Sequence, residues 1–301
     1  MAMRLLTRGD LDGLTSSVLL TLVQDVREIR FAHPKDVQDG KVPCDASDIV
    51  VNLPHVKGCG MWFDHHVSED SKLDEIGKFE GRFEVAPSCA RVIYRHYNSP
   101  KFAAFDELVK ETDRLDAAQL EESDVTDPQG WILLGYTLDP RTGLGPDFQK
   151  YFRWLVEYVK EVSLEKVLAH PLVDARIAKV KAEHKQYAQF LENTTHLDGT
   201  VIMNDLRGLK GVPVGNRFLV YTLHPEGNVE MRIFSGHQGA TVVACGHSIF
   251  NRTCNVNIGD LMQKYGGGGH RGAGTCQLKG DSVEDQIAQI KRTLLDNSPE
   301  G

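Results

Sequence analysis

Acidic and imidazole side chains gather at three places in the first third of the chain. Asp10 and Asp12 stand two apart in a loop after an apolar run, Asp64-His65-His66 ends another apolar run, and Asp113 and Asp116 are three apart on a predicted helix. Carboxylates with a few imidazoles bind divalent cations such as Mn²⁺ or Mg²⁺. Taken together, and in this order, the three groups indicate a divalent-cation site.

Each group alone has a plainer interpretation. Asp-x-Asp-Gly is more often a turn than a pair of ligands, and a lone Asp113 is more often a solvated helix residue. The functional prediction therefore depends on the combination of these groups with a glycine-rich segment further along the chain.

That segment, residues 266–274, reads GGGGHRGAG. Glycine amides can point at phosphate oxygens, and histidine and arginine add charged donors. The pattern matches neither a Walker loop nor the dinucleotide-binding fingerprint, and a flexible turn is the alternative. The candidate substrate-binding residues are Gly267, Gly268, Gly269, His270 and Arg271, with Arg252 as a further candidate that could equally be a solvated charge.

The hydrophobic pattern supplies the elements that must position these groups. In the first part, strands are predicted over 4–7, 28–33, 48–53 and 61–63, and helices over 14–26, 88–97 and 102–117. Strands that alternate with helices favour a parallel sheet, and ligands bind beyond the carboxyl ends of its strands. The acidic and imidazole groups that follow strands fall at that edge.

In the later part of the chain, predicted strands follow one another with fewer helices between them. Strands are predicted over 201–203, 218–223, 229–234, 241–244 and 275–278, with a hairpin turn at 225–227, and helices over 148–162, 173–193, 258–265 and 283–295. The fold class is therefore α/β. We expect a parallel-sheet domain over 1–172, a connecting helix over 173–196 and a smaller mixed α/β domain over 197–301, with a cleft between the two domains.

Composition restricts the class of protein. The 301 residues carry 34 basic against 42 acidic side chains, a formal charge of −8, which disfavours binding of long duplex nucleic acid. The six cysteines form no Cys-x-x-Cys pair, which argues against a structural zinc site and a disulfide framework. No apolar run reaches the length of a membrane helix or of a signal peptide, so we expect a cytoplasmic protein that does not bind membranes.

These motifs together resemble the DHH-type phosphoesterases that carry a C-terminal DHHA1 domain. Residues 8–15 stand at the first motif of that family, 48–53 at the second and Asp64-His65-His66 at the third, while Asp113 suits the fourth. Residues 266–273 resemble the GGGH loop of DHHA1. The resemblance covers nearly the whole chain, and the third motif and the glycine loop are its most specific parts.

The resemblance implies a role for each residue. The family binds two metal ions, usually Mn²⁺, which activate water for attack on a phosphate ester. Asp10 would serve the first ion and Asp12, His65 and Asp113 the second. His66 would face the scissile phosphate, and Asp64 would help to orient the site.

The sequence departs from the family pattern at two positions of the first ion site. Where the family often has a histidine before its aspartates, this chain has Leu6 and Arg8, and Asn52 stands in place of a bridging aspartate. Three interpretations stay open: His55 replaces the imidazole, Arg8 acts as a fixed cation against phosphate, or the site is weakened. We favour a functioning, metal-selective site with one or two ions, Asn52 among the ligands and Arg8 among the catalytic residues.

The expected activity is therefore hydrolysis of short oligonucleotides or small nucleotide phosphates, as in the nanoRNase and pAp phosphatase members of the family. The alternatives are an exopolyphosphatase, a cyclic-dinucleotide phosphodiesterase, or a nucleotide-binding protein that has lost hydrolysis. The partner would be a small phosphate-bearing substrate, and a homodimer is compatible with the sequence.

Overall fold

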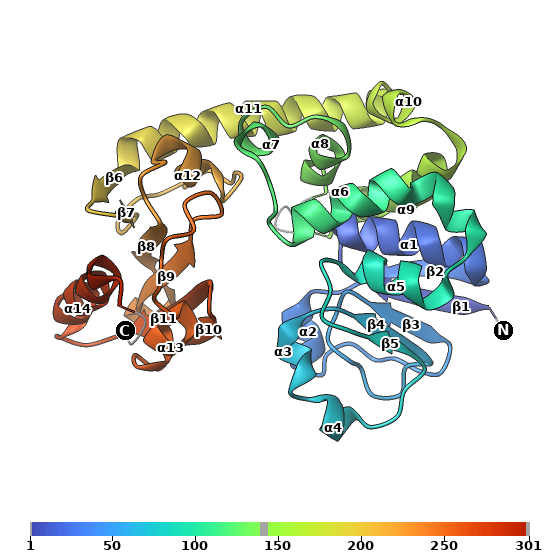
Figure 1. The fold of residues 1–301 in the computed structure, drawn as a ribbon, viewed down its shortest axis with the longest axis horizontal. Helices are drawn as coiled ribbons and strands as arrows, with labels where there is room; N and C mark the ends of the chain where they lie inside the picture. Colours follow the sequence, from blue (N-terminus) through green and yellow to red (C-terminus); the bar gives the residue numbers. More distant parts are fainter. Residues whose placement is uncertain (1, 139–143, 299–301) are drawn as a thin grey trace. The chain divides into compact units, whose positions relative to one another are not determined.

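The computed structural model describes residues 2–138 and 144–298 and divides the chain into two compact units (Figure 1). The first unit comprises Met1–Leu120 and Pro128–Val180, and the second comprises Glu121–Asp127 and Lys181–Gly301. The division falls inside the long helix α11 (Pro171–Thr194), which therefore contributes residues to both units.

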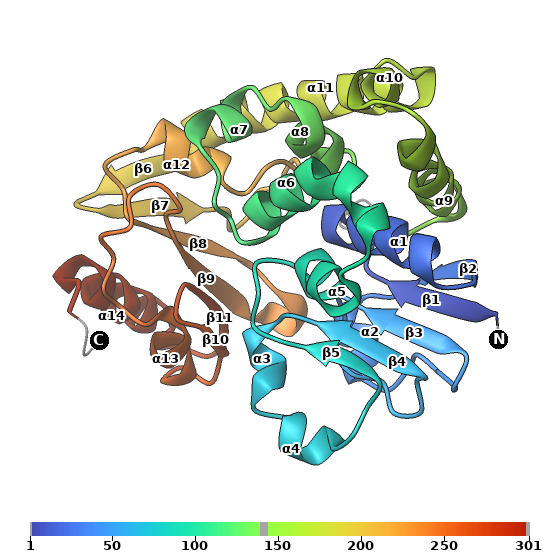
Figure 2. The same cartoon turned by 45° about the vertical axis from the view of Figure 1, so that its right-hand side comes forward.

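The first unit contains a five-stranded sheet in which every pair of neighbours is parallel. Its strands are β1 (Met3–Thr7), β2 (Val26–Phe31), β3 (Asp48–Val51), β4 (Met61–Asp64) and β5 (Gly81–Phe83), in the spatial order β2-β1-β3-β4-β5 (Figure 2). The predicted parallel α/β sheet is confirmed. The sequence missed β5, because three residues carry too little periodicity to be recognised.

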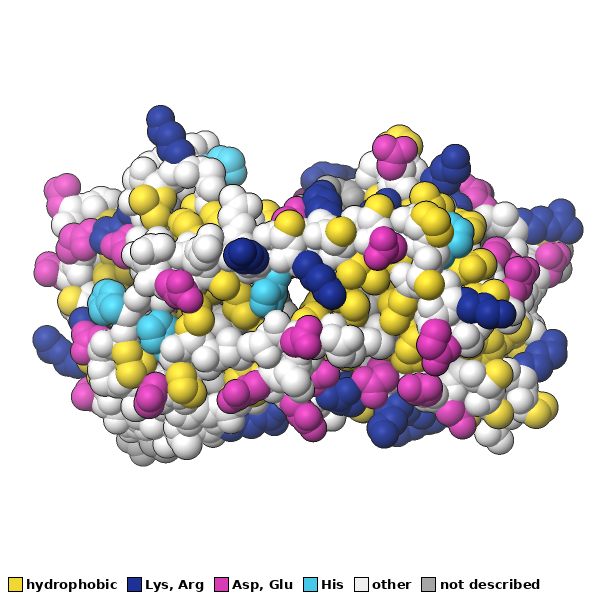
Figure 3. All heavy atoms as spheres, turned by 90° about the horizontal axis from the view of Figure 1, so that it is seen from above, with side chains coloured by type: hydrophobic (Ala, Val, Ile, Leu, Met, Phe, Trp, Pro, Cys, Tyr) yellow, Lys and Arg dark blue, Asp and Glu magenta, His cyan; other side chains and the backbone are white. Residues whose placement is uncertain are grey.

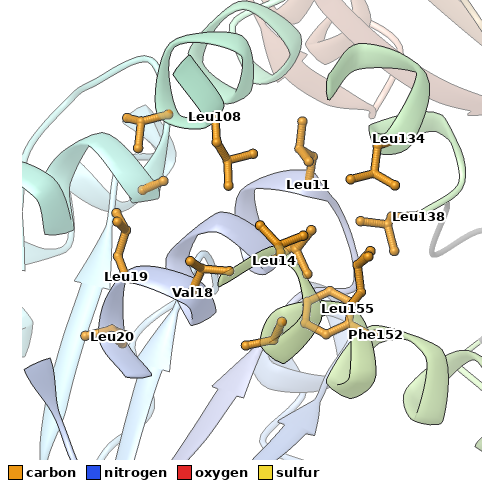
Figure 4. Packing of buried hydrophobic residues seen from close by; sticks show 14 of the residues in the cluster. Leu11, Leu14, Val18, Leu19, Leu20, Leu108, Leu134, Leu138, Phe152 and Leu155 are labelled. Atoms are coloured by element: carbon orange, nitrogen blue, oxygen red, sulfur yellow. The ribbon is translucent and has the colours of Figure 1, made fainter. Parts of the chain in front are cut away.

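Alternation along these strands divides the apolar side chains between the two faces of the sheet. Leu5 and Phe63 belong to a large buried cluster, whereas the adjacent Leu6 and Trp62 belong to a smaller one. Helix α1 (Leu11–Val23) packs its leucines into the large cluster against side chains from α6 (Asp106–Asp116), α8 (Gly130–Tyr136) and α9 (Pro146–Glu161) (Figure 4). This packing fixes α1, and with it the loop that carries Asp10 and Asp12.

Helices and short helical turns make up the rest of the first unit. They are α1 (Leu11–Val23), α2 (Pro34–Gln38), α3 (Val67–Asp70), α4 (Leu73–Ile76), α5 (Cys89–Tyr97), η1 (Pro100–Phe105), α6 (Asp106–Asp116), α8 (Gly130–Tyr136), α9 (Pro146–Glu161) and α10 (Leu164–Leu168). The short α7 (Glu122–Thr126) belongs to the second unit.

The second unit contains a six-stranded mixed sheet with the order β10-β11-β9-β8-β7-β6. Its strands are β6 (Thr195–Asp198), β7 (Val201–Asp205), β8 (Val229–Ser235), β9 (Thr241–His247), β10 (Gly268–His270) and β11 (Ala273–Leu278). Its remaining elements are α12 (Leu219–Leu223), η3 (His237–Gly239), α13 (Ile258–Gln263) and α14 (Val283–Asp296).

Two predictions for this unit are wrong. Leu219–Leu223 forms a helix, not a strand, so the turn at 225–227 does not join a hairpin. The reason lies in the topology: β7 and β8 are parallel, and a parallel pair needs a crossover connection, which α12 helps to form. The apolar, β-branched composition of this segment favoured a strand locally, and the crossover overrides that preference.

Within residues 2–138 and 144–298, no helix combines the length and the apolarity that crossing a bilayer requires.

Candidate metal centre and phosphate-binding segment

The loop after β1 places two aspartates at the start of α1. Asp10 is the N-cap of this helix, and its Oδ1 accepts a hydrogen bond from the Gly13 amide at 2.9 Å. Asp12 lies in the first turn of the helix and is buried. The position of both carboxylates is therefore set by the helix itself.

The Asp12 carboxylate is held by the first turn of α5. Its Oδ2 accepts from the Cys89 amide at 2.9 Å and its Oδ1 from the Ala90 amide at 2.8 Å, in the region where a helix favours negative charge. Burial, together with the nearby charge of Asp116, nevertheless raises the pKa of Asp12 to about 7. The carboxylate is fixed in place and lacks a counter-charge.

His65 follows β4 and turns one edge of its ring toward two carboxylates. Its Nδ1 lies 3.0 Å from the Ala86 carbonyl, which only accepts, so Nδ1 carries a proton and Nε2 is the ring nitrogen available to a cation. Nε2 is buried without a hydrogen-bond donor, 3.2 Å from Asp116 Oδ2 and 3.6 Å from Asp12 Oδ2. Acceptors that face one another in this way need a cation or a proton between them.

Ligand atoms of Asp12, His65 and Asp116 all lie within 4.8 Å of one another, and burial raises the pKa of Asp116 as well. Two carboxylate oxygens and one imidazole nitrogen suit a divalent ion such as Mn²⁺. This donor set fits a bound divalent cation.

The second histidine of the motif has a different environment. His66 Nδ1 lies 2.7 Å from Oδ1 of the buried Asp64. Burial acts to lower the pKa of His66, but the hydrogen bond and the charge of Asp64 outweigh it and raise that pKa to about 9. His66 is therefore an imidazolium at neutral pH, and its Nε2–H is a charged donor.

Helix α6 places its two aspartates differently from the prediction. Asp113, the predicted ligand, accepts hydrogen bonds from Ser88 Oγ at 2.6 Å and from Arg91 Nε at 2.8 Å. The described residues hold two groups of potential metal ligands, Asp12-His65-Asp116 and Asp64-His65-His66, and Asp113 belongs to neither. Asp116, one turn later, lies beside His65 and Asp12, so the geometry favours Asp116 over Asp113 as the third ligand.

Asp10 has partners of its own. Its Oδ2 lies 2.9 Å from Arg8 Nε, and its Oδ1 accepts from Asn52 Nδ2 at 3.0 Å. Asn52 is fully buried at the end of β3 with φ +54, a left-handed conformation that asparagine tolerates. Arg8, Asp10 and Asn52 thus form a small polar network of their own beside the cluster.

His55 belongs to another part of the first unit. Its ring packs against Trp62 at 5.2 Å and Phe79 at 6.4 Å between centroids, in the smaller apolar cluster. Burial lowers the pKa of His55. No group of potential ligands in the described part of the chain contains it, so we do not assign it to the metal centre.

The glycine-rich segment of the second unit is a strand, not an open loop. Gly268–His270 form β10, which pairs with β11. A Cβ at Gly267 would lie 2.1 Å from the Thr275 carbonyl oxygen, and one at Gly269 would lie 2.2 Å from that of Ala273. These two glycines allow close packing of backbone, whereas Gly268 is exposed and has nothing within 4 Å of an added Cβ.

The charged residues around this strand are exposed. His270 Nδ1 accepts from the Gly272 amide at 3.1 Å, and Arg271 Nη2 makes a long contact of 3.4 Å to the Asn255 carbonyl. Arg252 Nε donates to the Ile249 carbonyl at 2.9 Å. His247, which the sequence did not single out, lies on the neighbouring strand β9 and near Gly272. Its backbone N–H donates to the Gly272 carbonyl at 2.8 Å. The two residues are 25 positions apart in the sequence, so only the pairing of β9 with β11 brings them together.

Along 96% of this chain and 98% of the other, the protein is similar, at 34% identity and a TM-score of 0.82, to the pGpG-specific phosphodiesterase PggH of Vibrio cholerae. The chain therefore belongs to the DHH/DHHA1 phosphoesterase family, and by that membership it is an enzyme that hydrolyses phosphate esters.

An exopolyphosphatase-related protein of Bacteroides fragilis has a similar fold, with a TM-score of 0.52 at 10% identity over 99% of this chain and 92% of that one. A scan of family models found no match, and a search of curated proteins found none either.

Proposed function

We propose that the protein is a metal-dependent phosphodiesterase that cleaves short linear dinucleotides, with pGpG as the first substrate to test. The similarity to PggH along almost the full length of both chains supports this choice of substrate. The observation that carries the reaction is the buried Nε2 of His65, which faces two carboxylates next to an imidazolium.

Asp12, His65 and Asp116 would hold the divalent cation, and Mn²⁺ is our choice of ion. When bound, such an ion supplies charge that offsets the phosphate oxygens and makes a water molecule more acidic. The Cys89 and Ala90 amides keep Asp12 in position for this, and the Ala86 carbonyl keeps the lone pair of His65 on Nε2.

His66 is our candidate for the general acid. As the oxygen of water bonds to phosphorus and the ester P–O bond breaks, the leaving oxygen needs a proton, and the imidazolium Nε2–H can supply it. Asp64 orients the ring through Nδ1 and holds the proton on it by raising its pKa. The guanidinium of Arg8 adds a fixed positive charge beside Asp10.

The second unit would bind the part of the substrate that does not react. Exposed Gly268, His270 and Arg271 offer an amide, an imidazole and a guanidinium to a terminal phosphate or a base, with Arg252 and His247 as further candidates. On the face in Figure 3, basic and acidic side chains are intermingled. The formal charge of −8 suits a small substrate better than a long duplex. We propose the cytoplasm as the compartment.

The proposal is tested with purified protein reconstituted with Mn²⁺ and assayed against pGpG, pApA, a longer oligoribonucleotide, pAp, a cyclic dinucleotide and polyphosphate. We expect mononucleotide product from the linear dinucleotides, fastest from pGpG, and little turnover of the longer RNA. His66→Gln serves as the matched inactive variant.

Two results would overturn the proposal. Turnover of polyphosphate alone would reject the nucleotide substrate. Tight binding of pGpG without product under Mn²⁺, Mg²⁺ and Co²⁺ would show a binding protein that has lost hydrolysis.

A further inference from the structure

We propose that this centre holds one divalent cation per chain, and that the Arg8 guanidinium occupies the place of a second. The proposal concerns the centre of the proposed function but predicts metal content, which is measured without any substrate.

The Asp10 carboxylate is largely used by N–H donors from this chain. Its Oδ1 accepts from the Gly13 amide at 2.9 Å and from Asn52 Nδ2 at 3.0 Å, which uses both lone pairs of that oxygen. Its Oδ2 faces Arg8 Nε at 2.9 Å. Oδ2 keeps one lone pair, so a cation at Asp10 would have to share that oxygen with the Arg8 guanidinium, whose positive charge opposes it.

Asn52 turns its NH₂ group toward the place where a second ion would lie. A carboxylate only accepts hydrogen bonds, so the side of the amide that faces Asp10 must be the nitrogen. The partial positive charge of that NH₂ group would repel a cation beside Asp10. The Asn52 Oδ1 is turned away from Asp10 and has no hydrogen-bond partner among the described residues.

Arg8 provides the positive charge in this position. The only ion pair of its guanidinium within the described residues is with Asp10, and it is made through Nε. The side chain is 35% exposed, which leaves it open to a phosphate. A guanidinium is permanently charged and is part of the chain. Its positive charge therefore does not depend on the binding of a metal ion from solution.

The convergence of ligands also favours one ion. Ligand atoms of Asp12, His65 and Asp116 lie within 4.8 Å of one another, and neither group of potential ligands among the described residues includes Asp10. Asp10 is instead held by donors from this chain.

These contacts suggest a variant that would accept a second ion. Arg8→Gln removes the positive charge beside Asp10, and Asn52→Asp replaces the NH₂ donor there by a carboxylate. Aspartate also tolerates the left-handed backbone of position 52. The double variant would offer two neighbouring carboxylates, at positions 10 and 52, to a second cation.

The experiment measures manganese per chain by elemental analysis after reconstitution and removal of free metal, together with the electron paramagnetic resonance spectrum. We expect one ion in the wild-type protein, with the spectrum of an isolated Mn²⁺. The R8Q/N52D variant should bind two, with the spectrum of a coupled pair, while the charge-conserving Arg8→Lys should still bind one. Circular dichroism and thermal melting show whether each variant is folded.

Two ions in the wild-type protein would overturn the proposal, and this measurement stands even if the double variant does not fold. A folded double variant that still binds one ion would also reject the role given to Arg8 and Asn52. Both results are independent of the substrate, so an inactive protein with one ion would contradict the proposed function and leave this inference intact.

Discussion

The metal centre of the first unit and the glycine-rich strand of the second both present polar groups that suit a phosphate ester, but they are built differently. Asp12 and His65 are buried, and each is fixed by backbone groups. His270 and Arg271 are exposed and have few contacts. The first arrangement is preorganised at a cost in desolvation, and the second is open to solvent.

This difference leads to different expectations for the two regions. Buried, fixed groups that hold a cation stabilise the transition state more than the bound substrate. Changes to these groups should therefore lower kcat. Exposed groups bind substrate and transition state alike, so changes to these groups should raise KM. Variants of the buried centre and of the exposed strand should therefore differ in which kinetic constant changes.

The largest effect is expected at Asp116. Replacement by asparagine removes one charge from the proposed ligand set, and we expect kcat to fall by about 10³-fold. The rise in melting temperature that Mn²⁺ gives the wild-type protein should shrink in parallel, because the variant binds the ion more weakly. Steady-state kinetics and thermal melting with and without Mn²⁺ measure both effects.

Asp113→Asn is the matched control, one helical turn away. Its amide oxygen can still accept from Arg91, so kcat should change by no more than about twofold, and any loss should appear as a small loss of stability. If the Asp113 variant lost the metal and the Asp116 variant kept it, the ligand assignment from this structure would be reversed.

The next largest effect is expected at His66. Its replacement by glutamine should lower kcat by about 10²-fold or more, as is usual for loss of a general acid, without changing the manganese content. A nucleotide ester with a p-nitrophenolate leaving group needs little protonation, so the same variant should lose much less activity on it. An equal loss on both substrates would contradict the acid role and favour simple binding of phosphate.

A smaller effect is expected in the second unit. Arg271→Ala should raise KM for a dinucleotide about 10-fold, the equivalent of ~1.4 kcal/mol, with little change in kcat. Arg292→Ala, which removes an exposed charge from α14, controls for net charge and should leave KM unchanged. A fall in kcat with unaltered KM would place Arg271 among the groups that act on the reacting phosphate.

The sequence predicted the parallel sheet because apolar runs alternate with helical periodicity, and it brought Asp12, His65 and His66 to one edge because strand ends in such a sheet share that edge. It led to Asp113 as the third ligand, whereas the structure brings Asp116, on the same face of α6, to His65 and Asp12. The choice depends on Arg91 of α5, which pairs with Asp113 across a tertiary contact.

In the second unit, too, contacts between distant parts of the chain decide what the local sequence leaves open. The local composition of residues 219–223 favours a strand, and only the parallel pairing of β7 with β8 explains the helix found there. The glycines at 266–269 look equivalent in the sequence, yet a Cβ would strike backbone at two of them and meet open space at Gly268. Residues of one motif thus differ in their packing, and this difference depends on strand register, which the local sequence does not reveal.

The smallest effect sharpens this last contrast. At Gly267, an added methyl would lie 2.1 Å from a rigid carbonyl, so Gly267→Ala should destabilise the β10–β11 pairing by about 1–3 kcal/mol, as overpacking does. Gly268→Ala should change it by less than ~0.5 kcal/mol, because its site is open. Amide hydrogen exchange over residues 268–278 measures the effect locally: exchange should accelerate in the first variant and stay near wild type in the second. If both variants exchanged alike, the glycines would be interchangeable, and the strand would be better described as the flexible phosphate loop that the sequence first suggested.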